Sequence, residues 1–226
     1  IEGMFAIALF DIADQSISLI RDFAGIKPLF YSYNKGNVVF GSRYDLVAKH
    51  NNSIDNAIDK EVLKTYLKMH YIPAPYAILE DTFQVYPGEC VNIDFKGKLS
   101  KYIYWEFPAL SEEDLISDKE EALRFLDSKL KESVKDQLNA DVPLGTFLSG
   151  GIDSPLVTSY AKASKDDLKA FTVGSDSKVH DESEDAKTYA SLIGVDMLLE
   201  KMVASSAKKI LKDCMLNLQE PFADYS

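Results

Sequence analysis

Cysteine, histidine and tryptophan are scarce in this sequence of 226 residues, which contains two, three and one of them, respectively. Cys90 and Cys214 lie far apart, and neither has a spacing that is typical of a metal site or a redox motif. His50, His70 and His180 are equally scattered. This scarcity argues against a metal centre built on cysteine and histidine, and it favours a reduced, cytoplasmic setting.

Basic residues and long apolar runs are also in short supply. Lys and Arg number 25 against 36 Asp and Glu, so the formal net charge is -11. Non-specific nucleic-acid binding depends on basic patches, which such a chain is poorly placed to supply. No apolar run is long enough to span a membrane, and no signal-peptide pattern is present. We therefore expect neither a nucleic-acid nor a membrane partner, whereas a small anionic ligand could still bind in a local pocket.

An apolar run, a pair of glycines and a helical pattern follow one another near the middle of the chain. Residues 145–148 are typical of a buried strand, Ser149-Gly150-Gly151 come directly after it, and a helical pattern follows Ser154. The first amides of a helix lack intrahelical partners, the helix dipole favours negative charge there, and glycines let the backbone approach an anion closely. The stretch predicts an anion site; the alternative is a tight turn that merely requires small residues.

The side chains of this turn indicate the kind of anion. Ser149 and Ser154 add hydroxyl donors, whereas Asp153 would repel a phosphate and therefore implies a bridging divalent cation such as Mg²⁺. No Lys lies in the turn, which excludes the Walker loop.

The first hundred residues are predicted to form mainly antiparallel strands. A helix is predicted at 59–70 with Asp59 as its cap, because Val62, Leu63, Tyr66 and Leu67 have helical spacing. The predicted strands, the first of them buried, cover residues 3–10, 17–20, 30–33, 38–40, 90–95 and 100–105.

Strands and helices alternate in the second half. An acidic, irregular stretch at 108–117 is predicted to be a linker, and Ser117 to Glu120 match a capping box before a long amphipathic helix. Alternation predicts a parallel sheet, whose ligands bind beyond the carboxyl ends of the strands, where the glycine turn and Val173-Gly174 lie. Strands are predicted at 145–148, 169–173 and 195–199, and helices at 156–163, 184–193 (closed by Gly194) and 206–218.

The string Ser-Gly-Gly-Ile-Asp-Ser at 149–154 resembles the pyrophosphate loop of the ATP pyrophosphatases. Nearly the whole chain resembles the glutamine-hydrolysing asparagine synthetase family, and the motifs occur in the family's order. The matching segments are 3–6, 21–22, 25–29, 40–42, 87–88 and 104–105 in the first half, and 141–145, 147–154, 171–174 and 220–224 in the second.

The resemblance implies a mixed α/β and α+β protein. Residues 1–107 would be the carboxyl-terminal part of a glutamine amidotransferase domain, an N-terminal-nucleophile αββα sandwich. Residues 118–226 would be the amino-terminal part of a parallel-sheet ATP-pyrophosphatase domain, of the adenine nucleotide α-hydrolase-like kind. The family converts ATP, aspartate, glutamine and water to asparagine, glutamate, AMP and pyrophosphate through a β-aspartyl-AMP. The resemblance further implies a cytoplasmic enzyme and a possible homodimer.

The resemblance also implies roles for particular residues. Asp153 would hold Mg²⁺, and Asp22 would bind the α-amino group of glutamine; a surface Asp paired with Arg21 is the alternative for Asp22. The residues implied to bind ATP and pyrophosphate are Phe147, Leu148, Ser149, Gly150, Gly151, Ile152, Asp153, Ser154, Val173 and Gly174.

The sequence departs from the family's pattern in several places. The cysteine at the mature amino terminus and the second glycine-acid loop are absent, so we expect no catalytic residue in this chain and no turnover by it alone. Both ends are interpreted as cut from something longer. Pro155 stands where a second serine commonly follows, which a first helical turn tolerates. Arg43 stands where the family more often has Glu, without an explanation from the sequence.

Three functions remain open at this point. The acceptor could be aspartate, or another carboxylate, since family members amidate sugars, close β-lactams or cyclise peptides. The chain could also be a nucleotide-binding module without turnover. Asp181 and Glu182, which follow the second predicted strand of the parallel sheet, could face the substrate cavity or form a solvated acidic run.

Overall fold

The computed structural model describes residues 1–34, 37–50, 57–176, 181–203, 210–211, 213–215 and 217–223. They form two compact units. Unit 1 comprises Ile1–Ala109 together with the described residues from Cys214 onward, and unit 2 comprises Leu110–Asp213. The predicted helix at 206–218 and His180 lie partly or wholly outside the described residues. No helix in the described part of the chain is long and apolar enough to cross a membrane.

Unit 1 contains two antiparallel sheets. The first has the order β1-β2-β6-β7, built from β1 (Ala6–Asp11), β2 (Ser16–Arg21), β6 (Glu89–Asp94) and β7 (Leu99–Ile103). The second has the order β4-β3-β5, built from β3 (Phe30–Asn34), β4 (Asn37–Gly41) and β5 (Thr82–Gln84). The antiparallel strands predicted from the sequence are confirmed.

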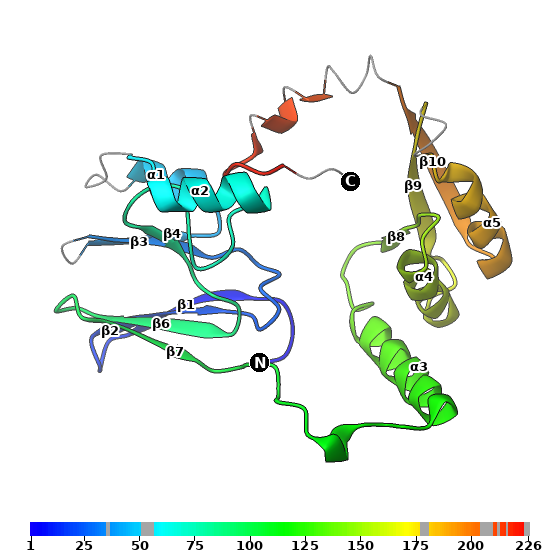
Figure 1. The fold of residues 1–226 in the computed structure, drawn as a ribbon, viewed down its shortest axis with the longest axis horizontal. Coiled ribbons are helices and arrows are strands. Elements are labelled where there is room, and N and C mark those ends of the chain that lie inside the picture. The colour runs from blue at the N-terminus through cyan, green and yellow to red at the C-terminus, as the bar shows by residue number, and fades with distance from the viewer. Residues whose placement is uncertain are drawn as a thin grey trace. The chain divides into compact units, whose positions relative to one another are not determined.

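The layers of unit 1 follow from the alternation of side chains along β3. Tyr31 joins Leu19 and Val91 in a core between the two sheets, whereas the adjacent Phe30 points the other way and packs with Tyr44 of α1 (Tyr44–His50). Figure 1 shows α1 and α2 (Lys60–Met69) over the sheet that contains β3, with the β1-β2-β6-β7 sheet beneath it. Unit 1 therefore has a helix layer on two stacked sheets.

Local signals explain α2 well, but not every element of unit 1. The side chain of Asp59 accepts hydrogen bonds from the amides of Glu61 and Val62, which confirms it as the helix cap. By contrast, α1 was not predicted. The expectation of a buried first strand is wrong for Leu9 and Phe10, which are 54% and 57% exposed, because β1 lies at the edge of its sheet.

Unit 2 contains the parallel sheet that alternation predicts. Its strand order is β10-β9-β8, from β8 (Gly145–Phe147), β9 (Lys169–Ser175) and β10 (Asp196–Met202). The helices are α3 (Lys119–Asp136), α4 (Asp153–Ser164) and α5 (Ser183–Ile193), preceded by a short 3₁₀ turn η1 (Glu112–Asp114). Helix α5 ends at Gly194, whose φ of 72° is left-handed, as the closing glycine predicts.

All three helices pack on one core beside the sheet. Ala161, Ala170 and Ala186 form its centre, and their small side chains let the helices approach the strands closely. Phe171 and Val173, which alternate with buried residues along β9, are exposed instead.

Two expectations for unit 2 are wrong. The strand at 145–148 was predicted to be buried, but β8 lies at the sheet edge and only Leu148, just beyond it, is buried. The cap of α3 was predicted to be Ser117; it is Asp118, whose carboxylate accepts from the amide of Glu121. Asp118 immediately precedes α3, so its carboxylate lies next to the unpaired amides of the first helical turn.

Candidate functional site

The glycine loop, which we define as residues 149–154, lies at the carboxyl end of the parallel sheet. Two hydrogen bonds attach the residue before it to β9. The amide of Leu148 donates to the carbonyl of Phe171 at 2.9 Å, and Oγ1 of Thr172 donates to the carbonyl of Leu148 at 2.8 Å. The loop therefore starts from a fixed point at the edge where parallel sheets bind their ligands.

Two serines connect the ends of the glycine loop. Oγ of Ser154 accepts from the amide of Ser149 at 2.9 Å and lies 2.8 Å from Oγ of Ser149, which in turn accepts from the amide of Gly151 at 3.3 Å. The loop leads directly into α4, whose amino-terminal cap Ile152 makes no side-chain cap bond among the described residues. The hydroxyls thus hold the turn in shape at the start of a helix.

Gly150 and Gly151 differ in what surrounds them. A Cβ added to Gly150 would lie 3.0 Å from Cβ of Asp185 and 3.1 Å from Cβ of Glu182, because the start of α5 packs against the loop. A Cβ added to Gly151 would meet only Oγ of Ser149, at 3.5 Å. Close packing therefore disfavours a Cβ at Gly150, whereas Gly151 is exposed and has room beside it.

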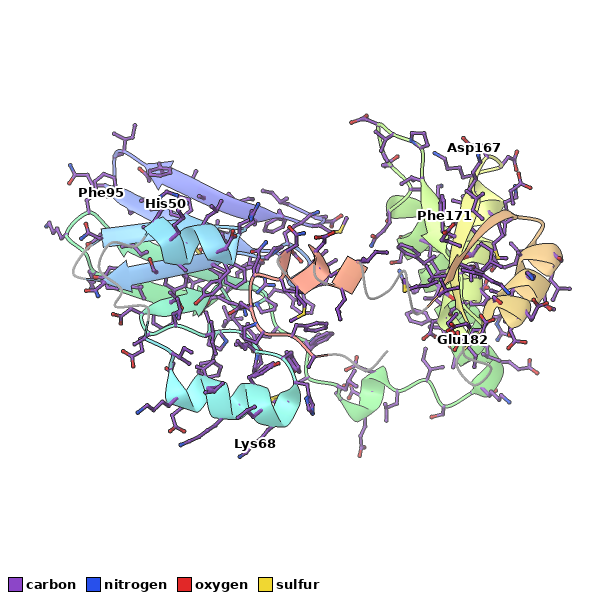
Figure 2. The ribbon with its side chains drawn as sticks, turned by 90° about the horizontal axis from the view of Figure 1, so that it is seen from above. His50, Lys68, Phe95, Asp167, Phe171 and Glu182 are labelled. Carbon is purple, nitrogen blue, oxygen red and sulfur yellow. The ribbon has the colours of Figure 1, made fainter. Side chains whose placement is uncertain are left out.

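The amide of Gly150 already has an anionic partner within the chain. It donates to Oε2 of Glu182 at 3.0 Å. Figure 2 labels Glu182 at the opposite end of the sheet from Asp167, which precedes β9. The middle of the glycine loop, residues 151–153, is exposed, and of the three loop amides with partners within the chain only that of Gly150 holds a carboxylate.

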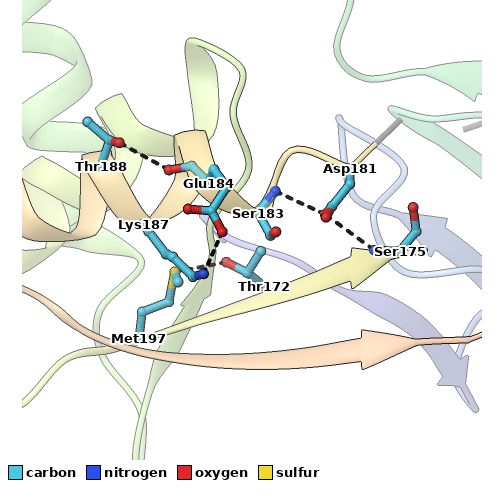
Figure 3. A network of polar contacts seen from close by, with 8 residues as sticks. All are labelled: Thr172, Ser175, Asp181, Ser183, Glu184, Lys187, Thr188 and Met197. Atoms are coloured by element: carbon cyan, nitrogen blue, oxygen red, sulfur yellow. Dashed lines mark hydrogen bonds and ion pairs between the residues drawn. The ribbon is translucent and has the colours of Figure 1, made fainter. Parts of the chain in front are cut away.

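A second set of polar contacts links the end of β9 to the start of α5 beside the glycine loop. Oδ1 of Asp181 accepts from the amides of Ser175 and Ser183 at 3.3 and 3.2 Å, as Figure 3 shows. Contact with Ser183, then with Ser175, holds the pKa of Asp181 below its ordinary value. The Asp181 carboxylate therefore connects β9 with α5, so that of the two acids left open by the sequence only Glu182 is bonded to the loop. Gly174 is buried beneath Asp181.

The structure brings some of the predicted nucleotide residues together and leaves others apart. Ser149, Gly150, Gly151 and Ser154 share one turn, and Asp153 begins α4 beside it. Phe147 and Ile152 are 82% and 81% exposed, and Val173 is exposed on the same sheet. Leu148 is buried and its amide is bonded to β9, so only the second lone pair of its carbonyl oxygen is left for a ligand.

One carboxylate of the loop could hold a metal ion together with a ligand. Among the described residues no group of three or more His, Cys, Asp or Glu side chains could bind a metal by itself. Mg²⁺ is often held by one or two carboxylates plus substrate phosphates, so Asp153 fits a cation that arrives with a polyphosphate. A free-standing protein metal centre is not supported in the described part of the chain.

Asp22, the predicted glutamine-binding residue, lies in unit 1 and is 1% exposed. Its two carboxylate oxygens accept from the amides of Ile26 and Lys27, both at 2.9 Å. Burial by itself would raise the pKa of Asp22, but the amides of Lys27 and Ile26 and the charge of Arg21 hold it below its ordinary value. The alternative of a surface Asp paired with Arg21 is wrong, because Asp22 is buried.

Two further residues acquire partners that their sequence positions did not indicate. Arg43 forms an exposed ion pair with Asp45, with Nη2 and Oδ2 2.7 Å apart. Glu220 is largely buried in unit 1, and burial raises its pKa to about 7. Glu220 belongs to one of the segments that carry the family resemblance, but its contacts join residues more than a hundred positions apart and therefore have no local signal in the sequence.

Comparison with known proteins finds two family models that match different parts of the chain. Residues 1–105 match the glutamine amidotransferase domain, and residues 126–226 match the asparagine synthase family. The amidotransferase match thus precedes the asparagine synthase match along the chain.

Curated relatives match nearly the whole chain. Asparagine synthetase [glutamine-hydrolyzing] 1 of Bacillus subtilis is 30% identical over 99% of this chain and 35% of its own length. Putative asparagine synthetase [glutamine-hydrolyzing] 2 of Methanocaldococcus jannaschii is 30% identical over 99% of this chain and 44% of its own length. The amidase chyE of Penicillium rubens is 28% identical over 99% of this chain and 35% of its own length.

The chain is therefore related, in both of its units, to the glutamine-hydrolysing asparagine synthetases, and it spans 35% and 44% of the length of the first two relatives. Among solved structures, the NH3-dependent NAD synthetase of Campylobacter jejuni matches this chain with a TM-score of 0.33 and 19% sequence identity. The match covers 42% of this chain and 41% of the synthetase chain.

Proposed function

We propose that the protein containing this chain is a ligase that converts aspartate to asparagine, using ATP and ammonia taken from glutamine, and that it releases AMP and pyrophosphate. The observation that carries the proposal is the exposed glycine loop, held by Ser149 and Ser154 at the carboxyl end of a parallel sheet. The relationship to asparagine synthetases over 99% of the chain supports the choice of reaction.

The chemistry fits the residues of the loop. A carboxylate is a poor electrophile, and adenylation gives it a good leaving group while negative charge develops on the departing pyrophosphate. The amides of Gly150 and Gly151 and the hydroxyls of Ser149 and Ser154 would bind that group. Asp153 would hold Mg²⁺, which supplies charge neutralisation when bound.

Other predicted residues would complete the two sites. Phe147, Leu148, Ile152, Val173 and Gly174 would surround the nucleotide, the buried ones through their backbone groups. Asp22 would bind the α-amino group of glutamine, which requires a carboxylate oxygen to accept a further hydrogen bond beside the amides that it already serves.

The finer fold and the cellular setting belong to the same proposal. The helix layer and two sheets of unit 1 are consistent with part of an N-terminal-nucleophile αββα sandwich, and unit 2 with part of an ATP-pyrophosphatase fold. The two free cysteines suit a reducing, cytoplasmic compartment. The homodimer stays a prediction, to be checked by analytical ultracentrifugation of the intact protein.

Calorimetric titration of the intact protein with ATP and Mg²⁺ tests the nucleotide site. We expect binding to be lost in Asp153→Ala and retained in Asp167→Ala, which removes an exposed carboxylate at the other end of the sheet. Equal binding by both variants would contradict the proposal. The acceptor is tested by following labelled products from aspartate and from other carboxylates.

A second candidate keeps the chemistry and changes the acceptor. The relative named amidase chyE matches the chain over the same length as the asparagine synthetases, at 28% identity. If labelled aspartate yields no asparagine while another carboxylate is amidated, this second function replaces the first.

A further inference from the structure

The carboxylate of Glu182 occupies a position that an anionic ligand would be expected to take. Oε2 of Glu182 lies 3.0 Å from the amide nitrogen of Gly150. The backbone of Gly150 packs closely against the start of α5. A carboxylate oxygen and a phosphate oxygen compete for the same kind of backbone donor. The Glu182 carboxylate therefore binds the amide that an anionic ligand would use.

The position of Glu182 in the chain makes this contact notable. It is the residue immediately before α5, where a polar side chain often accepts from an amide of its own helix. Glu182 makes no such bond among the described residues and reaches across to the glycine loop instead. The neighbouring Asp181 instead accepts from the amides of Ser175 and Ser183. Two adjacent acids thus have different partners.

Glu182 is also able to leave. Its side chain is exposed and carries three rotatable bonds before the carboxylate, so it could swing into solvent without opening the core of unit 2. Asp185 lies on the same side of Gly150, and a second carboxylate there adds to the local negative charge. An arriving polyphosphate must replace the hydrogen bond to Glu182 and enter an acidic neighbourhood.

We propose that Glu182 is an internal competitor that holds the Gly150 amide in the absence of ligand and is displaced by the pyrophosphate group of the nucleotide. The inference rests on the proposed function, because it requires the glycine loop to bind pyrophosphate. It goes further by assigning to Glu182 a role in setting how tightly the loop binds. Glu182 lowers the affinity of the empty loop for anions and leaves the amide available only to a ligand that outcompetes it.

The test is calorimetric titration of the intact protein with inorganic pyrophosphate and Mg²⁺. Removing one competing hydrogen bond in Glu182→Ala should tighten pyrophosphate binding by about three- to tenfold. Glu182→Gln keeps an acceptor oxygen without the charge and should lie between that variant and the wild type. Glu184→Ala is the matched control, because Glu184 is also exposed, lies in the first turn of α5 and pairs with Lys187 rather than with the loop.

Each outcome has a separate meaning. If wild type binds pyrophosphate and Glu182→Ala binds it equally or more weakly, Glu182 does not compete and the inference fails while the proposed function stands. If neither wild type nor any variant binds pyrophosphate, the proposed function fails and the inference with it. A change in the amide resonance of Gly150 in ligand-free Glu182→Ala, absent from Glu184→Ala, would show that the contact exists in solution; an unchanged resonance would overturn it.

Discussion

Glu220 lies against Gln84, with Nε2 of Gln84 donating to Oε2 of Glu220 at 3.3 Å. The other carboxylate oxygen accepts from the amide of Ile78, also at 3.3 Å. Neighbouring residues are attached in the same way, since Oε1 of Gln219 accepts from the amide of Tyr44 at 2.6 Å. A segment that follows unit 2 in the sequence is thus part of unit 1.

The raised pKa of Glu220 predicts a pH-dependent stability of unit 1. Burial raises the pKa from 4.5 to about 7, so the folded state holds this proton more tightly than the unfolded state does. The resulting stabilisation is complete below the unfolded value and is lost as the pH rises through the folded value. We expect wild type to lose stability relative to Glu220→Gln between about pH 5 and about pH 8, measured by chemical unfolding.

Exposed Glu80 provides the control for this experiment, as a carboxyl in the same unit. Glu80→Gln should follow wild type at every pH. Parallel curves for wild type and Glu220→Gln would show that Glu220 does not titrate as its burial requires.

Arg21 is predicted to be indispensable to unit 1. Its buried guanidinium donates to the carbonyls of Lys27, Gly25 and Val85 at 2.9, 2.7 and 2.9 Å, a fan of acceptors that a lysine ammonium cannot reach together. Arg21→Lys should therefore destabilise unit 1 by about 2–4 kcal/mol, since buried carbonyls are left without partners. Unfolding can be followed by the fluorescence of Trp105, the chain's single tryptophan.

Arg43→Lys is the comparison for Arg21→Lys, because Arg43 is exposed and pairs only with Asp45 among the described residues. Its cost should stay below about 1 kcal/mol, as for other surface ion pairs. Similar losses in the two variants would contradict the role given to Arg21.

Two glycines with the same backbone angle should respond differently to substitution. Gly88 and Gly194 both have φ of 72°, which strains any residue with a Cβ. At Gly88 the added carbon would also lie 2.5 Å from the carbonyl oxygen of Trp105, whereas at Gly194 it would meet nothing within 4 Å. Gly194→Ala should cost about 1 kcal/mol and Gly88→Ala clearly more, about 2–4 kcal/mol, in chemical unfolding. Equal losses of stability in the two variants would mean that the backbone near Trp105 shifts to accommodate the added carbon.

The two loop glycines should separate stability from binding. Gly150→Ala places a carbon about as close to Glu182 and Asp185 as packing tolerates, so it should lower the stability of unit 2 by about 1–2 kcal/mol. Gly151→Ala has room, so it should leave stability nearly unchanged while weakening pyrophosphate binding by about tenfold, because the methyl group covers the open side of the turn. Unfolding followed by circular dichroism and calorimetric titration measure the two effects. The reverse pattern would show that Gly151, not Gly150, serves packing.

Elements with strong local signals were predicted from the sequence. Asp59 caps α2 and Gly194 ends α5, because such caps act through bonds within a few residues. The alternation of strands and helices was sufficient to predict the parallel sheet. Helix α1 was missed because its seven residues span about two turns, too few for a periodic pattern to stand out.

Burial was predicted less well than secondary structure. Phe147, Leu9 and Phe10 are apolar residues of the edge strands β8 and β1, yet they are exposed. A strand buries a side chain only where another layer covers that face. Apolar character in the sequence shows that burial would be favourable. It does not show whether another layer of the fold covers the residue and buries it.

The sequence by itself determined the antiparallel and parallel strands and the position of the serine-glycine turn between a strand and a helix, because each depends on neighbours along the chain. Only the tertiary structure decided that Glu182 takes the amide of Gly150, that Asp22 is buried on the amides of Ile26 and Lys27, and that Glu220 reaches Gln84. Except at Asp22, these contacts join residues that are distant in sequence, and all of them depend on how packed elements bring charge and amide together. The hydrophobic periodicity of the sequence carries no information about these contacts.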